Sequence, residues 1–132
     1  MARYPLLSLL ALLALVGCTK PEGQRLEREA VQALYTDHTA VGYHERKNFG
    51  FRRYYAPDGR LEAWNDRQGH RQGRWWVSND GRHCVQMANT DEHCRDIYRG
   101  ADGHHRKYGW VWCGYRLLLS YRDFQPGRHI AP

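Results

Sequence analysis

The chain has 132 residues, 42% of them hydrophobic, and includes 5 tryptophans, 9 tyrosines and 3 phenylalanines. This composition excludes an intrinsically disordered protein, and the length suffices for one domain with a modest core. The formal net charge of +6 excludes an acidic protein and favours anionic partners.

The N-terminal residues have the layout of a bacterial secretory signal. One basic residue, Arg3, precedes the apolar run Leu6–Val16, and this order of a charged start and a short apolar stretch is typical of exported proteins. The run is too short for a transmembrane helix, which needs about 20 apolar residues. A buried core helix is the alternative, but such a helix would have no polar face here.

The end of this run, Leu15-Val16-Gly17-Cys18, resembles the lipobox of bacterial lipoproteins. The resemblance implies that residues 1–17 are a signal peptide and that the thiol of Cys18 carries the lipid, with palmitate among the acyl chains. Two or more acyl chains anchor a protein firmly. Residues 18–23 would then be a short tether, and residues 24–132 a single β-rich domain. Thr19, after the cysteine, favours the outer membrane, facing the periplasm.

Such a location bears on the expected partners. After removal of Arg3 the chain keeps 19 basic and 14 acidic residues, a net charge of +5. We expect the membrane, through the lipid anchor, and an anionic envelope polymer or a protein to be the partners; nucleic acid is not expected. The alternative is that dispersed charge serves solubility alone.

One amphipathic helix is predicted at residues 24–35, before the strands begin. Its apolar stripe would consist of Leu26, Ala30, Ala33 and Leu34. We expect this helix to pack on the sheet or to close one end of a barrel.

Three Asp-Gly pairs recur at intervals of 22 residues: Asp58-Gly59, Asp80-Gly81 and Asp102-Gly103. Asp-Gly is a strong hairpin signal, because glycine accepts a positive φ and aspartate bonds to its own turn. Further breaks at residues 66–69 and 89–91 leave room for two short strands in each interval.

The segments between these turns alternate in the manner of half-buried strands, as in Gly73-Arg74-Trp75-Trp76-Val77. The predicted fold class is therefore all-β: an antiparallel up-and-down meander of about six to eight strands. The meander would form a curved sheet or a small barrel, with one N-terminal helix.

Cys84 and Cys94 would lie opposite each other in a hairpin centred on residue 89, within reach of a disulfide. The same register places Arg82 opposite Asp96, an opposite-charge pair. Cys113 would then be left over, reduced and buried beside Val111.

The histidines offer a metal site only as a weak alternative. His83 and His93 would be diagonal neighbours on one hairpin face, with His104 or His105 as a third ligand, but the spacing matches no zinc pattern. The simpler interpretation is exposed, solvated histidines. Neither histidine can activate the adjacent cysteine, because neighbouring strand side chains point to opposite faces.

No enzyme signature is present. The serines that follow the signal, Ser78 and Ser120, lie in no Gly-x-Ser-x-Gly motif, and no glycine-rich phosphate loop occurs. We therefore expect a protein without catalytic residues and without a cofactor.

A set of short motifs resembles an uncharacterised family of small exported proteobacterial β-proteins, over roughly residues 30–127. The motifs are residues 54–59 (YYAPDG), residues 73–77 (GRWWV), Cys84, residues 94–98 (CRDIY) and residues 124–127 (FQPG). The resemblance implies an envelope location and an all-β fold. It implies no reaction and no catalytic residues.

Aromatic side chains that lie off the core parity, together with nearby arginines, form the predicted ligand face: Arg52, Tyr54, Trp64, Arg74 and Trp76. Stacking beside guanidinium suits a sugar or an anionic polymer. The expected function is that of a non-catalytic, lipid-anchored binding or structural module. The alternatives are an inhibitor resembling the lysozyme-inhibitor lipoproteins, whose cationic target a +5 domain would repel, and a metal-binding envelope protein.

Overall fold

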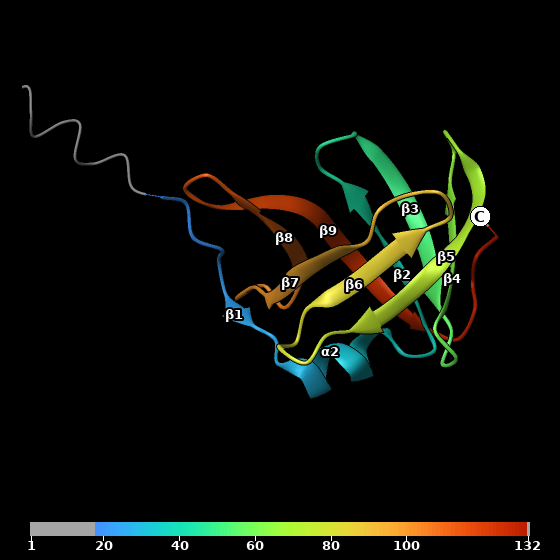
Figure 1. Ribbon diagram of the computed structural model, residues 1–132, viewed down its shortest axis with the longest axis horizontal. Coiled ribbons are helices and arrows are strands. Elements are labelled where there is room, and N and C mark those ends of the chain that lie inside the picture. Colours follow the sequence, from blue (N-terminus) through green and yellow to red (C-terminus); the bar gives the residue numbers. More distant parts are fainter. Residues whose placement is uncertain (1–17, 132) are drawn as a thin grey trace, which may run out of the picture.

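The computed structural model describes residues 18–131, so the predicted signal peptide and the first three lipobox residues lie outside the described part. Of the described residues, 56% lie in strands, and they form a closed antiparallel barrel of eight strands with one short helix (Figure 1). This confirms the all-β prediction and decides between a curved sheet and a barrel.

The helix is α2 (Arg28–Tyr35), and the strands are β1 (Gln24–Arg25), β2 (His38–His44), β3 (Phe49–Tyr55), β4 (Arg60–Asn65), β5 (Gly69–Val77), β6 (His83–Met87), β7 (His93–Arg99), β8 (His105–Val111) and β9 (Gly114–Pro126). Within residues 18–131, no helix has the length and apolarity that a membrane crossing requires.

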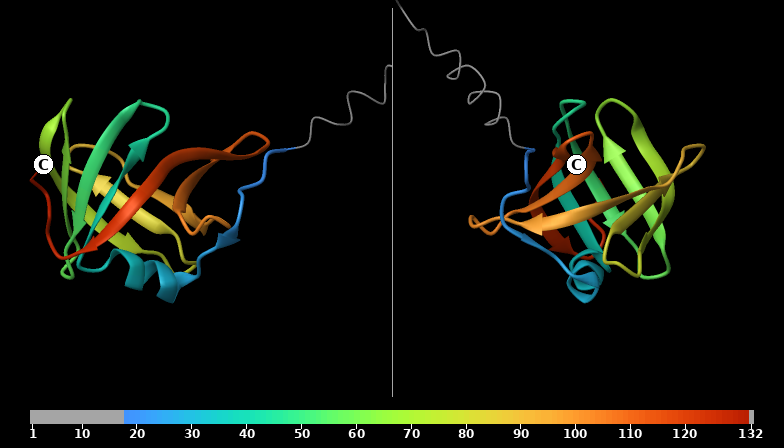
Figure 2. Two further views of the ribbon diagram at one scale, coloured as in Figure 1. Left: turned by 180° about the vertical axis from the view of Figure 1, so that it is seen from behind. Right: turned by 60° about the vertical axis from the view of Figure 1, so that its left-hand side comes forward.

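The barrel has up-and-down topology throughout. Each strand from β2 to β8 pairs antiparallel with the next one in the chain, and β9 returns to pair with β2, which closes the cylinder. The short β1 is an addition to this cylinder, because it pairs with the last residues of β7, beyond the part of β7 that pairs with β6. Figure 2 shows the closed wall from two further directions.

The three Asp-Gly pairs form the β3–β4, β5–β6 and β7–β8 turns, and each glycine has a positive φ, between 82° and 94°. Because every second turn of a meander lies at the same end, all three occupy the end of the barrel that α2 covers (Figure 1). A Cβ on Gly81 would lie 3.0 Å from the backbone nitrogen of Arg28, where the helix begins. Each interval of 22 residues thus contains two strands, one leading away from the helix end of the barrel and one leading back to it.

The helix is shorter than predicted, and its buried face differs. It begins at Arg28, because Gln24 and Arg25 are held in strand pairing by β7. Val31 and Tyr35 are its fully buried residues. Ala30 and Ala33, expected in the apolar stripe, are exposed.

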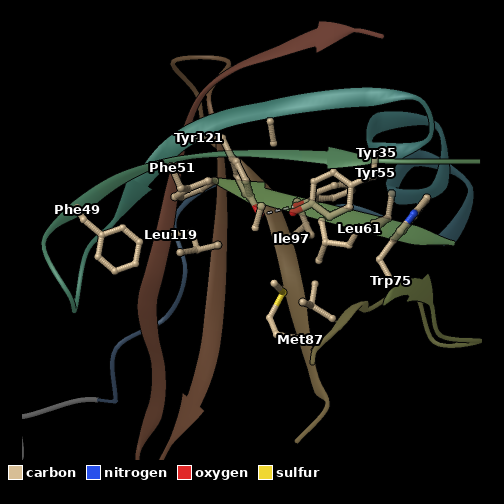
Figure 3. Close-up of a cluster of buried hydrophobic side chains, with 14 residues drawn as sticks. Tyr35, Phe49, Phe51, Tyr55, Leu61, Trp75, Met87, Ile97, Leu119 and Tyr121 are labelled. Atoms are coloured by element: carbon tan, nitrogen blue, oxygen red, sulfur yellow. Dashed lines mark hydrogen bonds between the residues drawn. The ribbon is translucent and has the colours of Figure 1, made fainter. Parts of the chain in front are cut away.

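The inward faces of the strands enclose an aromatic core, drawn in Figure 3. Tyr35 enters it from the helix, donates a hydrogen bond to the hydroxyl oxygen of Tyr121 at 2.8 Å, and packs edge-on against Tyr55. Trp75 is buried beside them, on the strand face opposite to that of Trp76. The helix therefore closes one end of the barrel with an aromatic side chain.

The Cys84–Cys94 disulfide is present, and the two cysteines are directly opposite in the β6–β7 ladder with Cα atoms 4.0 Å apart. The companion pair is present too: the Nε of Arg82 lies 3.5 Å from Asp96. The predicted hairpin register is confirmed by both.

The prediction for Cys113 was wrong. Cys113 is neither reduced nor buried beside Val111; it lies half-buried in the β8–β9 turn and forms a second disulfide with Cys18, while Val111 is exposed. The residue after Cys18 explains the proximity, because Thr19 makes a parallel bridge to Gly114. Two disulfides are consistent with an extracytoplasmic protein.

Candidate functional site

The predicted ligand residues share the outer surface of the barrel wall, but they do not form one site. Arg52 on β3 and Trp64 on β4 are direct cross-strand partners, and both line a groove of about 520 Å³. This groove, which brings two of the predicted ligand residues together, is our candidate functional site.

The groove crosses five strands, from β4 through β3, β2 and β9 to β8, and is bounded by the β7–β8 turn. Its lining comprises Val41, Gly42, Tyr43, Gly50, Phe51, Arg52, Trp64, Asp102, His104, His105, Arg106, Ser120, Tyr121 and Arg122. The site thus depends on barrel closure, since β2 and β9 lie side by side only because the last strand returns to the first.

Basic side chains dominate the polar lining. Arg106 is paired with Asp102 at 2.7 Å; its hydrogen bond, followed by the backbone N–H of His104, holds the pKa of Asp102 at about 2. Arg52 donates to the amide oxygen of Gln125 and to the carbonyl of His129. Within residues 18–131, neither Arg52 nor Arg122 has a carboxylate within 4 Å. The groove therefore holds two cations without a local counter-charge.

Two aromatic side chains provide apolar surface beside these cations. Trp64 is half-buried next to Arg52, and Tyr43 is 41% exposed, its hydroxyl 3.4 Å from Asn48. Aromatic faces alternating with guanidinium groups can stack on sugar rings and bind attached anions. No group placed as nucleophile and base is needed for such binding.

The other three predicted residues lie elsewhere on the wall. Tyr54 is buried against Ala56 and Ile130, and donates its hydroxyl hydrogen to Asp37 at 2.6 Å. Arg74 donates to Gln86, and Trp76 sits with it in a separate shallow depression. The C-terminal segment that covers Tyr54 could not be inferred from strand parity.

The two histidines considered as weak metal ligands have different environments. His83 is not an exposed, solvated histidine: it is fully buried, and its ring stacks on Tyr35 with centroids 3.6 Å apart. His93 is exposed on the neighbouring strand. In the described part of the chain, no three His, Cys, Asp or Glu side chains are grouped so that they could hold a metal ion.

The burial of His83 leads us to expect that the stability of the barrel is sensitive to acid. Burial, followed by the charges of Lys107 and Arg53, lowers the pKa of His83 well below its ordinary value, and neither ring nitrogen has a hydrogen-bond partner among residues 18–131. The unfolded chain therefore binds a proton at His83 below about pH 6.5 that the folded chain does not bind. Stability is full above that pH and falls as the pH decreases, by up to about 1.4 kcal/mol per unit from this group.

Urea unfolding between neutral pH and pH 5 measures this slope. We expect His83→Phe, which keeps a flat ring against Tyr35, to have a smaller loss of stability on acidification than the wild type. Equal slopes for the two proteins would show that His83 is not responsible.

The barrel interior also contains unexpected cations. Lys107 is only 4% exposed and lies on the inward face between Ile97 and Leu119. Burial, then the charges of Arg53 and Arg95, lower the pKa of Lys107 well below its ordinary value. These three basic side chains line neither the groove of the candidate site nor the depression beside Trp76, so they do not belong to either surface.

Sequence reasoning missed the groove residues contributed by β2, β8 and β9. Arg106 and Arg122 are separated from Arg52 by more than 50 positions, and no local pattern connects them; the alternation of Tyr121 with Arg122 was the only signal of an outward arginine.

In comparisons with known proteins, no family model, no curated protein and no solved structure matches this chain.

Proposed function

We propose that the protein is a non-catalytic, lipid-anchored module of the bacterial cell envelope that binds an acidic polysaccharide in the outer groove. One observation carries the binding proposal: Arg52 and Arg122, without local carboxylate partners, lie with Trp64 and Tyr43 in a single groove of about 520 Å³. Charged sugars offer anions for the arginines and ring faces for the aromatics.

The net charge supports the same ligand class. A positive protein attracts a polyanion over a long range and is repelled by a cationic enzyme such as lysozyme. Inhibition of a hydrolase is therefore the less favoured function, and a lysozyme activity assay with the purified protein tests it directly.

The anchor proposal depends on the sulfur atom of Cys18. One sulfur cannot carry a lipid thioether and also bond to Cys113, so the disulfide described above and the acylated form exclude each other. In the acylated protein Cys113 is a free thiol beside the anchor. The apolar run and the lipobox resemblance support acylation, and Thr19 supports the outer membrane, facing the periplasm.

Intact mass spectrometry of protein isolated from its native membrane tests the anchor. We expect a chain that begins at Cys18 with the added mass of diacylglycerol and an acyl chain. A chain with unmodified cysteines, or with a Cys18–Cys113 disulfide as its main form, would contradict the anchor but leave the groove proposal intact.

Binding is tested by titrating the purified protein with an oligogalacturonate, and with a neutral malto-oligosaccharide of the same length. We expect affinity for the acidic sugar alone, weakened by salt. Arg52→Ala should weaken binding about tenfold, which corresponds to about 1.4 kcal/mol, and Trp64→Ala should have an effect of similar size.

Arg74→Ala is the matched control, because Arg74 is also an outward arginine on the same wall but lies outside the groove. Its affinity should equal that of the wild type. If Arg52→Ala and Arg74→Ala weaken binding equally, the protein attracts the acidic sugar through its overall positive charge, and the groove is not the binding site.

A further inference from the structure

The end of the β8–β9 hairpin is the most exposed apolar surface of the described chain. Three consecutive residues contribute to it: Trp110 is 57% exposed, Val111 40% and Trp112 100%. Only one other large hydrophobic side chain of residues 18–131, Tyr43, is similarly exposed. Large apolar side chains clustered at one projecting turn indicate a contact surface.

The N-terminal segment of the described chain is fixed to this same hairpin. Cys18 is bonded to Cys113, and the N–H of Tyr115 donates to the carbonyl of Thr19 at 3.0 Å. A Cβ on Gly114 would lie 2.2 Å from that carbonyl oxygen, so the docking requires glycine there. The chain thus enters the domain beside the hairpin tip, at the barrel end opposite α2 (Figures 1 and 2).

The apolar run Leu6–Val16 ends only two residues before Cys18. Whatever holds the N-terminus to a membrane, an apolar segment or a lipid on Cys18, therefore attaches next to Trp112. A membrane that holds the N-terminus would therefore lie against the exposed end of the β8–β9 hairpin.

Basic groups surround the tip. The guanidinium of Arg82 lies over the ring of Trp110, 5.5 Å from its centroid, and Arg116 is exposed on β9, opposite Gly109. Lys20 is exposed close to the disulfide. Tryptophan with lysine and arginine is the combination that favours the headgroup region of an anionic bilayer.

We propose that the β8–β9 tip inserts into the headgroup region of the phospholipid bilayer, with Trp112 entering first and Trp110 and Val111 following. The inference rests on the membrane location proposed above, but it does not require a lipid on Cys18. The tip fixes the orientation of the barrel, with the α2 end directed away from the membrane and the groove on the side wall accessible.

Fluorescence quenching by acyl-chain-brominated phospholipids tests this contact, with the full chain in phosphatidylethanolamine and phosphatidylglycerol vesicles. We expect strong quenching of the wild type. Trp110→Phe/Trp112→Phe should remove most of the quenched emission, whereas the matched control Trp64→Phe/Trp76→Phe should retain it. Quenching that survives in the first variant and is lost in the second would overturn the proposal.

A Cys18→Ser chain separates this inference from the lipid anchor, because it cannot be acylated. Quenching of the tip tryptophans in that chain, and at least a tenfold weaker vesicle partition of Trp110→Ser/Trp112→Ser in the same background, would support insertion even if no lipid were found on Cys18. An acylated wild type without quenching would contradict insertion alone.

The competing occupant is a second copy of the chain. Sedimentation without lipid distinguishes it: a dimer that dissociates in Trp112→Ser would assign the tip to self-association and overturn the proposal. A monomer in both proteins is the expected result.

Discussion

Replacement of Trp75 by alanine is expected to lower the free energy of unfolding by about 4 kcal/mol, a value typical of the removal of a buried tryptophan side chain. Trp75 is 4% exposed, and its indole N–H donates to the carbonyl of Ala56 at 2.9 Å. Its ring packs edge-on against Tyr55 and next to Tyr35, the residue that closes the helix end. Alanine would leave a cavity in the centre of this aromatic group and would remove one of the two hydrogen bonds that the Ala56 carbonyl accepts, the other coming from the N–H of Gly59.

Urea unfolding monitored by circular dichroism measures the change as a lower midpoint at unchanged slope. Trp76→Ala is the matched control, because the adjacent tryptophan is half-buried on the outer surface; we expect a loss of less than about 1.5 kcal/mol. Comparable losses in the two variants would contradict the assignment of Trp75 to the core and Trp76 to the outside.

The barrel was predictable to the extent that local signals determine it. Asp-Gly turns specify hairpins by backbone geometry alone, and their equal spacing fixes an up-and-down order. Closure is different, because the pairing of β9 with β2 joins residues 75 to 88 positions apart, and no local pattern encodes it. The register of the β6–β7 hairpin was predictable from Cys84 and Cys94 because both flank one short loop.

The failures have identifiable physical causes. Helix propensity at Gln24 and Arg25 is overridden by backbone pairing to β7. Cys113 was expected to be free because lipidation had already been assigned to Cys18, whereas the bridge of Thr19 to Gly114 brings the two sulfurs together. Period-two alternation also could not indicate that Lys107 lies inside, since a buried cation contradicts the hydrophobic pattern used to find the inward face.

The residues of the candidate site also fall into those that local sequence patterns predict and those that they do not. Arg52 and Trp64 were identified because they lie on adjacent strands joined by a short turn, where parity transfers directly from one strand to the next. Arg106 and Arg122 were not identified, because their position beside Arg52 is a consequence of closure. Tyr54 shares the parity of Arg52 but is covered by the C-terminal residues around Ile130, a contact that strand patterning does not describe.

Asp96 is expected to be the most important charged residue for stability. It is 2% exposed, and it lies 3.1 Å from the Nε of Arg25 on β1 and 3.5 Å from the Nε of Arg82. Asp96→Asn keeps the shape of the side chain but removes its charge, which takes the acidic partner from Arg25 and leaves Arg82 with the exposed Asp80, 3.4 Å from its Nε. Removal of one member of a buried ion pair costs about 3–5 kcal/mol; since both arginines are about one-third exposed, we expect a loss of about 2–3 kcal/mol.

The Asp58–Arg60 pair provides the control for this measurement, because its ion-pair distance of 2.9 Å is similarly short but both side chains are exposed. Asp58→Asn should therefore cause no measurable change in the urea midpoint, since solvent and salt screen an exposed pair. Asp96 also connects β1 to the barrel through Arg25, so its loss should increase hydrogen exchange at residues 24–26 more than at the β3–β4 hairpin. A destabilisation of Asp96→Asn that disappears in high salt would indicate surface electrostatics in place of a buried ion pair that holds the N-terminal strand to the wall.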